Sequence, residues 1–408
     1  MPGKQTGLYV WLLLLLVFVL PVEAVAGGEE PFLTAGAVVL MDANNGQVLY
    51  QKNMRQRMFP ASTTKILTAV IALEKGNLSE RVIIPGEACR VDGSAIGLQE
   101  GERLTLEDLL YALMLASAND AAESIALHLA GSIQDFSVLM NDQAKSIGAQ
   151  MSNFTNPHGL AGANHYTTAY DLALITRYAL ENPSFRKIVR TRWKIISRPD
   201  ADRTKGPPQE HLWNHNRFLG RYDGAIGVKT GYTVEAGQCL VAAAQKGDRE
   251  LIAIILNGQG GTLYSDAGTI LDYGFTNFEP LLVVRQREKI STVNVSRGMD
   301  RVDLFAGDSF YYNFPLGQPQ DLMRRVQLDQ GIKAPLVAGQ KMGELILSAD
   351  GQEVGRVGLI TMQPVERFPG RLWLFLITGL VIMFIPFAGI RRAARRKGRL
   401  LSRRRFRY

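Results

Sequence analysis

The chain has 408 residues, of which 46% are apolar and 21% are charged, and this balance excludes a largely disordered protein. The formal net charge of +8 would suit a nucleic-acid-binding protein, but ten of the 46 basic residues lie between Arg391 and Tyr408. The rest of the chain carries 36 basic and 38 acidic side chains, so a nucleic-acid partner is not expected. The length allows two domains of about 100–200 residues each, with further segments at the ends.

The N-terminus has the three parts of a secretory signal peptide. Lys4 precedes an uncharged apolar run from Leu8 to Leu20, and Ala24-Val25-Ala26 is a small-x-small cleavage site. The run of 13 residues is too short to span a bilayer, which requires about 20. We therefore expect residues 1–26 to be a signal peptide and the mature chain to begin near Gly27; an uncleaved anchor is the alternative.

The first folded segment, residues 32–277, begins with a strand hairpin and a helix. Gly36–Leu40 and Gln47–Lys52 are predicted strands, and Asn45-Gly46 between them is a strong hairpin turn signal. A largely buried helix is predicted from Ser62 to Lys75, with Gly76 as its stop.

Several later helices carry capping signals. The hydroxyl of Thr105 can cap a helix that has Asp108 three residues further on. The chain then breaks at Ser117, and Asn119 or Asp120 can cap the next helix, which ends at Gly131. Further helices are predicted at Ser132–Ile147, Thr168–Glu181 and about Tyr264–Tyr273.

Three further strands are predicted near the end of the first segment, and a second segment without helices follows it. Val228–Thr230, Gln238–Gln245 and Leu251–Leu256 follow the helices, so we expect one sheet formed by both ends of residues 32–277, with a helical part inserted between them. From residue 279 to 364 the helical period disappears, and Asp350-Gly351 separates two strand-like runs. This second segment is predicted to be a small all-β domain that spaces or orients the first.

The C-terminal region predicts a membrane anchor. Leu372 to Ile390 is a run of 19 residues without a charge, which as a helix is about 28 Å long and close to the thickness of the hydrocarbon core. The arginine-rich tail, residues 391–408, is expected in the cytoplasm by the positive-inside rule, where it could also touch anionic lipid head groups. Both ends therefore indicate an exported body with one transmembrane helix; a buried core helix is the alternative.

The first candidate catalytic group is Ser62-Thr63-Thr64-Lys65. A serine hydroxyl is a poor nucleophile until a base takes its proton, and a lysine one helical turn later lies on the same face. That lysine must be neutral to act as the base, which requires a fall in its pKa of roughly 3 units and predicts a second cation nearby. Taken alone, the pair also fits a surface helix cap with a solvated lysine.

Two further motifs offer a proton relay, the second cation and donors for a substrate. Ser117-Ala118-Asn119 lies in a break between two helices, where a serine can relay a proton and an amide can hold a carbonyl or the first lysine; a helix cap is the ordinary explanation. Lys229-Thr230-Gly231 lies on a predicted strand and provides the second cation, a hydroxyl donor and a residue without a side chain. Together these groups suit a substrate carboxylate, and Gly231 allows a substrate backbone to approach the strand edge.

These three motifs, in this order, resemble those of the penicillin-binding proteins and serine β-lactamases. The segments Pro60 to Lys65, Asn156-Pro157-His158-Gly159-Leu160 and Gly227 to Thr233, with Ala236-Gly237, narrow the resemblance to the low-molecular-weight D-alanyl-D-alanine carboxypeptidases. It covers about residues 32–364. It implies an α/β (α+β) transpeptidase/β-lactamase-like catalytic domain followed by a small all-β domain and, at the C-terminus, the transmembrane helix.

The resemblance also implies a role for each motif residue. Ser62 forms the acyl-enzyme, Lys65 is its general base and Ser117 relays the proton to the leaving D-alanine. Backbone N–H groups of Ser62 and Tyr232 form the oxyanion hole. The residues expected to bind the substrate are Asn119, Lys229, Thr230, Gly231 and Tyr232.

Other reactive residue types receive less specific predictions. His158 is better explained as part of a structured turn than as a base, while His215 and Arg217 precede the third motif closely enough to line a cleft. The cysteines, Cys89 and Cys239, could form one disulfide, and two separate buried thiols are the ordinary alternative.

The sequence thus predicts a carboxypeptidase that removes the terminal D-alanine from peptidoglycan stem pentapeptides and is acylated by β-lactams. No metal or organic cofactor is expected, and the oligomeric state is not predicted. A DD-endopeptidase, a β-lactamase and a non-catalytic β-lactam sensor are the alternatives. A β-lactamase of this motif class uses a loop glutamate for deacylation, and no such Glu-x-x-x-Asn loop precedes Lys229.

Overall fold

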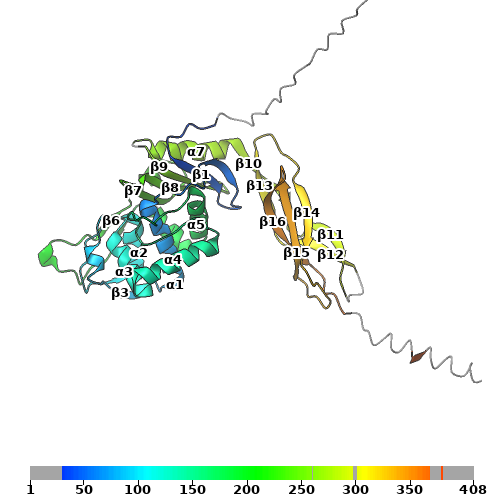
Figure 1. Ribbon diagram of the computed structural model, residues 1–408, viewed down its shortest axis with the longest axis horizontal. Helices are drawn as coiled ribbons and strands as arrows, with labels where there is room; N and C mark the ends of the chain where they lie inside the picture. Colours follow the sequence, from blue (N-terminus) through cyan, green and yellow to red (C-terminus); the bar gives the residue numbers. More distant parts are fainter. Residues whose placement is uncertain (1–29, 260, 297–300, 368–377, 380–408) are drawn as a thin grey trace, which may run out of the picture.

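The computed structural model describes residues 30–259, 261–296, 301–367 and 378–379. They form an N-terminal domain of mixed helix and strand and a C-terminal domain of strands only (Figure 1). The predicted signal peptide, residues 1–26, lies outside the described residues, as does the predicted membrane segment apart from Thr378 and Gly379. Among the residues that the structure describes, no helix is both long and apolar enough to cross a bilayer.

A five-stranded antiparallel sheet forms the centre of the N-terminal domain, in the order β2-β1-β9-β8-β7. Its first two strands come from the start of the domain and the other three from its end, which confirms the sheet predicted from both ends of the segment. The predicted hairpin is also present. The strands are β1 (Ala37–Asp42), β2 (Val48–Lys52), β7 (Ala225–Thr233), β8 (Gly237–Lys246) and β9 (Arg249–Gly258).

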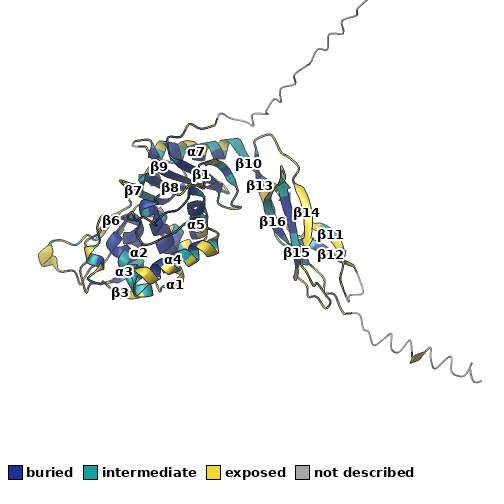
Figure 2. Ribbon diagram, viewed as in Figure 1, coloured by how far each residue is buried: buried dark blue, intermediate teal, exposed yellow. Residues whose placement is uncertain are grey.

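The sheet is covered on both faces. Alternate residues of a strand point to opposite faces, and in β1 Val39 packs into the core shared with the inserted helices, whereas Leu40 packs into the core beneath α7 (Leu263–Asn277). All six residues of β1 are therefore buried. Figure 2 shows this buried centre with the exposed surfaces around it.

The inserted part contains six α-helices among the described residues, and three of them begin at the residues where the sequence predicted a helix start. Thr105, Ser132 and Thr168 each accept a hydrogen bond from the backbone N–H of the aspartate three residues later, as a capping residue does. The helices are α1 (Lys65–Lys75), α2 (Leu106–Leu115), α3 (Asn119–Ala130), α4 (Ile133–Ile147), α5 (Ala169–Glu181) and α6 (Pro183–Arg190).

Two local predictions are corrected and one is confirmed. Ser62 lies in a 3₁₀ turn, Ala61–Thr64, that precedes α1. Gly76 is the C-cap of α1, as predicted, and has an extended conformation. Neither Asn119 nor Asp120 caps α3, because Ala118 occupies the capping position and offers no side-chain oxygen.

The structure also contains α6 and four short strands that the sequence did not predict. Asn182 caps α6 and Pro183 occupies its first turn. The strands have three residues each: β3 (Arg81–Ile83), β4 (Arg103–Thr105), β5 (Trp193–Ile195) and β6 (His211–Trp213).

The C-terminal domain is all-β, as predicted. Its main sheet has the order β11-β12-β16-β15-β14, and β10 pairs with β13 in a second, two-stranded sheet. The predicted turn at Asp350-Gly351 joins β15 and β16. The strands are β10 (Phe278–Val284), β11 (Lys289–Asn294), β12 (Arg301–Ala306), β13 (Phe310–Pro315), β14 (Met323–Leu328), β15 (Lys341–Ala349) and β16 (Gln352–Thr361).

Polar contacts join the two domains at the β1–β2 hairpin. The side-chain amide of Asn313 donates to a carboxylate oxygen of Asp42 at 3.0 Å, and its backbone N–H donates to the side chain of Gln47 at 2.7 Å. Because β10 also begins directly after α7, the domains are connected through the chain and through this contact.

Candidate active site

Ser62 lies where a tight turn enters α1. Ala61, just before it, has a φ of 48°, a region that residues with a side chain rarely adopt. Gly159 packs directly on this turn, and a side chain at Gly159 would overlap the carbonyl of Ala61. The turn is therefore held in a strained conformation by the segment Asn156-Pro157-His158-Gly159-Leu160.

Lys65 approaches Ser62 from the first turn of α1. Its Nζ atom lies 3.1 Å from the Oγ atom of Ser62, 2.6 Å from Oδ1 of Asn119 and 2.8 Å from the carbonyl oxygen of His158. The lysine side chain is fully buried. Burial and then the positive charge of Lys229 lower the pKa of Lys65 well below its ordinary value, while Asp120 opposes the change. The structure thus places beside the serine oxygen an amine whose neutral form is favoured, as a base requires.

The second motif, Ser117-Ala118-Asn119, is held in place by its backbone conformation and by the hydrogen bonds of the Asn119 side chain. Ser117 has a φ of 58° and is almost completely buried. The Nδ2 group of Asn119 donates to the carbonyl oxygen of Asp92 at 2.6 Å, while its Oδ1 accepts from Lys65. Its side chain is therefore fixed between these two partners.

The third motif lies on β7, which is at the edge of the five-stranded sheet beside β8. Lys229 is 1% exposed and donates to the carbonyl oxygen of Thr230 at 2.9 Å. Burial lowers the pKa of Lys229 to about 7. An added Cβ on Gly231 would lie 2.9 Å from the backbone nitrogen of Ser62, so this glycine lets β7 approach the serine turn. The sequence predicts that Gly231 makes room for the substrate, and the structure shows that it makes room for the catalytic turn as well.

A cavity of about 380 Å³ opens where these elements meet. Four residues of the three motifs line it, and so do His215 and Arg217, which confirms the prediction that these two line a cleft. Lys65, Asn119 and Lys229 lie behind this lining. The lining residues are Ser62, Ser94, Ser117, His215, Arg217, Thr230, Gly231, Tyr232, Gln238, Leu263 and Tyr264.

His158 supports the site instead of acting in it. Its Nδ1 accepts a hydrogen bond from the backbone N–H of Leu160 at 3.2 Å, and its Nε2 lies 3.3 Å from a carboxylate oxygen of Glu123. Desolvation lowers the pKa of His158, although its hydrogen bond to Glu123 opposes this. Its backbone carbonyl, not its imidazole, contacts Lys65. These contacts agree with the predicted loop-structuring role.

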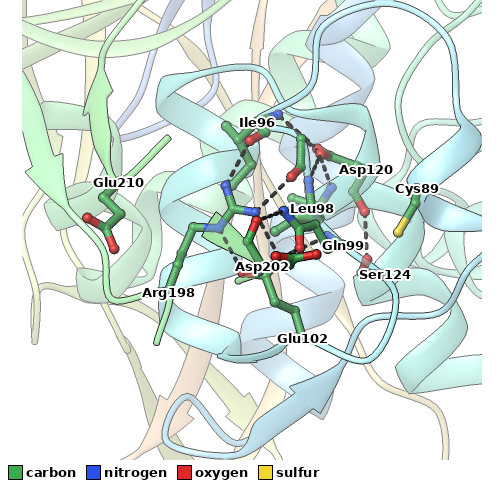
Figure 3. Close-up of polar contacts among 12 residues, drawn as sticks. Cys89, Ile96, Leu98, Gln99, Glu102, Asp120, Ser124, Arg198, Asp202 and Glu210 are labelled. Carbon is green, nitrogen blue, oxygen red and sulfur yellow. Dashed lines mark hydrogen bonds and ion pairs between the residues drawn. The ribbon is translucent and has the colours of Figure 1, made fainter. Parts of the chain in front are cut away.

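The wall that carries Ser94 is held by a buried polar network (Figure 3) that sequence reasoning missed. The guanidinium of Arg198, on the connection between β5 and β6, forms two hydrogen bonds of 2.8–2.9 Å with the carboxylate of Glu102. It also donates to the carbonyl oxygens of Ile96 and Gly97. No sequence pattern signals this network, because its members are far apart in the chain.

Asp120 fixes the same wall from the other side. Its carboxylate accepts backbone N–H groups of Ile96 and Leu98, as Figure 3 shows. The carbonyl oxygen of Ser94 accepts from the backbone N–H of Asn119 at 2.6 Å. The cleft wall at Ser94 is therefore tied to the start of α3 and so to the second motif.

The cysteines are not paired. Both are free thiols, and Cys239 is completely buried. Burial raises the pKa of Cys239 to about 11, so it is a packed thiol and not a nucleophile. Of the two arrangements considered from the sequence, the structure has two separate thiols.

Comparison with known proteins agrees with this geometry. Residues 24–260 match the family described as D-alanyl-D-alanine carboxypeptidase, and residues 278–367 match the C-terminal domain of penicillin-binding protein 5. The chain is 33% identical to D-alanyl-D-alanine carboxypeptidase DacF of Bacillus subtilis, over 82% of this chain and 86% of the relative. It is 30% identical to D-alanyl-D-alanine carboxypeptidase DacA of Haemophilus influenzae, over 86% and 91% of the two chains.

Among solved structures, penicillin-binding protein 5 of Haemophilus influenzae superposes with a TM-score of 0.70 at 28% identity, covering 84% of this chain and all of the other. The D-alanyl-D-alanine carboxypeptidase of Mycobacterium tuberculosis has a TM-score of 0.56 at 33% identity, over 60% of this chain and 92% of its own. The similarity to Haemophilus influenzae penicillin-binding protein 5 extends over both domains described here.

Proposed function

The chain belongs to the D-alanyl-D-alanine carboxypeptidases of the peptidase S11 family, and from this premise we propose a catalytic role for each residue of its site. It is a serine peptidase that releases D-alanine from peptides of the cell wall. The observation that carries the assignment to this site is the 3.1 Å separation between the amine of Lys65 and the hydroxyl of Ser62, together with the lowered pKa of the amine.

In the first half-reaction Ser62 attacks the carbonyl carbon between the two terminal D-alanines. Its proton moves to neutral Lys65, and the new ester bond forms as the carbon–nitrogen bond breaks. Ser117 relays this proton from Lys65 to the nitrogen of the leaving D-alanine. Water then hydrolyses the ester, which releases the shortened peptide and restores the serine hydroxyl.

The edge of β7 holds the end of the substrate. Lys229 provides positive charge and Thr230 a hydroxyl donor for the terminal carboxylate, and Asn119 positions both Lys65 and the peptide. Backbone N–H groups of Ser62 and Tyr232 stabilise the oxyanion, a contribution of about 2.7–4 kcal/mol for each donor. Gly231 supports this arrangement because its lack of a side chain lets β7 approach the serine turn. β-Lactams, which resemble the terminal dipeptide, acylate Ser62 in the same way.

The alternatives predict different products. The test uses the full chain, purified in detergent, with a peptide ending in L-lysyl-D-alanyl-D-alanine, a cross-linked muropeptide dimer and a penicillin. The expected result is release of D-alanine from the peptide and slow, stable labelling by the penicillin. Dominant cleavage of the dimer would indicate an endopeptidase, rapid penicillin turnover a β-lactamase, and labelling without any release a sensor; each of these would contradict the proposal.

We also propose that the enzyme works outside the cytoplasmic membrane and is held there by residues 372–390, with the basic tail inside. The support is the uncharged run and the arginines that follow it. The full chain is expected to stay with membranes during alkaline washing, whereas a chain ending at residue 367 is expected in the soluble exported fraction. Release of the full chain by washing would contradict the anchor.

A further inference from the structure

The hairpin formed by β5 and β6 presents an aromatic surface that the reaction described above does not use. In its antiparallel register Trp193 lies opposite Trp213, and Ile195 lies opposite His211. Since residues paired directly across two strands point to the same side, these four side chains share one face. The two tryptophan rings lie 6.5 Å apart with an angle of 43° between their planes.

This face is open to solvent. Trp193 is 57% exposed, Trp213 is 64% exposed and Ile195 is 52% exposed. Tryptophan is buried in most folded proteins, and a cluster of exposed apolar side chains marks a binding surface. We call these residues, Trp193, Ile195 and Trp213, the tryptophan face.

The other face of the hairpin is anchored, so the tryptophans are held on a rigid support. Leu212 is completely buried, and the amine of Lys194 lies 4.9 Å from the ring centre of Tyr111 on α2. The long connection between the two strands is fixed by Arg198, whose pairing with buried Glu102 ties it to the cleft wall (Figure 3).

The tryptophan face lies close to the catalytic cleft. His215, which lines the cavity, follows Trp213 by two residues, so their Cα atoms are at most about 7 Å apart. The backbone N–H of His215 donates to the carbonyl oxygen of Leu115, just before the second motif. Asn214, between them, donates to the backbone oxygens of Val189 and Thr191, which fixes the path from hairpin to cleft.

The substrate of the proposed reaction carries a sugar within reach of this surface. A stem pentapeptide whose last two residues lie at Ser62 spans at most about 17 Å, and its other end is attached to the glycan strand of the wall. One face of a pyranose ring consists of C–H groups with slight positive charge, which pack on the negative face of an indole ring. Two adjacent indoles therefore suit two successive sugars.

We infer that the tryptophan face is a glycan subsite, which binds the N-acetylated sugar strand while the attached stem peptide enters the cleft. The inference rests on the proposed function and extends it, because the enzyme then distinguishes wall polymer from free peptide. A lipid surface is the other ligand for exposed tryptophans. The position beside the cleft favours the glycan, since membrane contact would not require this proximity.

The test compares two substrates with the full-length enzyme in detergent. One is soluble, uncross-linked glycan strands that carry pentapeptides, and the other is the free pentapeptide. For the double variant Trp193→Ala/Trp213→Ala, we expect kcat/KM on glycan strands to fall about tenfold, through KM, which corresponds to about 1.4 kcal/mol. Activity on the free pentapeptide and penicillin labelling should not change. Phe32→Ala, which removes an aromatic side chain that is 90% exposed elsewhere, is the matched control.

Equal loss on both substrates, or loss on neither, would overturn the glycan subsite. If the variant instead lost binding to anionic phospholipid vesicles with both activities intact, the face would be a lipid contact. A wild-type enzyme that released D-alanine from neither substrate would overturn the proposed function alone. Quenching of tryptophan fluorescence by peptide-free glycan strands would then support the subsite, and its absence would overturn it.

Discussion

At the scale of single residues, the 3₁₀ turn at Ala61–Thr64 explains how Ser62 and Lys65 meet. Side chains three residues apart nearly eclipse one another in a 3₁₀ helix, whereas in an α-helix they are offset. The spacing of the two residues predicted their proximity, but it did not predict the turn, which depends on Gly159 packing against it from a distant part of the chain.

The pH dependence of catalysis should report the influence of Lys229 on Lys65. The base must be neutral, so kcat/KM rises with pH through the pKa of Lys65. Lys229→Gln removes a positive charge that disfavours the protonated amine. The pKa of Lys65 therefore rises, and the acid limb of the pH–kcat/KM profile should move to higher pH.

The matched control is Lys246→Gln, because Lys246 lies on β8 and pairs with the exposed Asp272 at 3.0 Å. This variant should keep the wild-type acid limb. An acid limb that stays in place in Lys229→Gln, or moves to lower pH, would show that Lys65 is not the titrating base.

Gly231 is predicted to be required for its lack of a side chain. In Gly231→Ala the added methyl group would lie 2.9 Å from the backbone nitrogen of Ser62, so the serine turn or β7 must shift. Because this displaces an oxyanion donor, the rate of penicillin acylation should fall by about 10²-fold. The measurement is labelling by a fluorescent penicillin over time.

Gly268→Ala serves as its control, since an added Cβ there would have an ordinary contact of 3.7 Å with the ring of Tyr222. It should acylate at the wild-type rate. If Gly231→Ala matched it, the close approach of β7 to the serine turn would have no role in acylation.

At the scale of elements, the sequence predicted the long helices and their caps, but it did not predict the short strands. The hydroxyls of Thr105, Ser132 and Thr168 marked helix starts because their hydrogen bonds are local. The strands β3 to β6 have three residues each, too few to show alternation, and they form only through partners far away in the sequence. Asn182-Pro183, at the start of α6, is a local helix start signal of the same kind.

The buried pair of Arg198 and Glu102 should contribute strongly to stability. Arg198→Ala leaves the carboxylate of Glu102 buried without its cation, which costs about 3–5 kcal/mol in the free energy of unfolding. The exposed pair of Arg203 and Glu210 belongs to the same connection, and Arg203→Ala should cost about 0–1 kcal/mol.

Urea denaturation of both variants measures the difference in unfolding free energy. Losses of equal size in the free energy of unfolding would show that the buried pair stabilises the protein no more than the exposed pair does. They would also remove the reason to regard Arg198 as the group that fixes the Ile96–Glu102 segment of the cleft wall.

At the scale of the whole molecule, the three motifs were enough to predict which parts of the chain meet. They lie at the start of α1, at the start of α3 and on β7, and the sheet built from both ends of the domain brings them to one cavity. The walls at Ser94, Gln238 and Tyr264 could not be predicted, because nothing local distinguishes these residues from others of their type.

The two domains should be separable. Every residue of the catalytic cavity lies before Asn277, and Asp42 at the domain contact keeps hydrogen bonds from the backbone N–H groups of Asn44 and Asn45. A chain ending at Asn277 should therefore fold and be labelled by penicillin at a rate close to that of the full chain. Failure to label, with the fold retained by circular dichroism, would show that the β-domain acts on the site.

The proposed reaction depends most directly on Ser62 as the nucleophile. The decisive measurement is D-alanine release from the pentapeptide by the wild type and by Ser62→Ala, with penicillin-labelled peptides mapped by mass spectrometry. We predict that the wild type releases D-alanine and carries the penicillin on Ser62, and that the folded variant does neither. Release that persists in Ser62→Ala, or a label on another residue, would contradict the account.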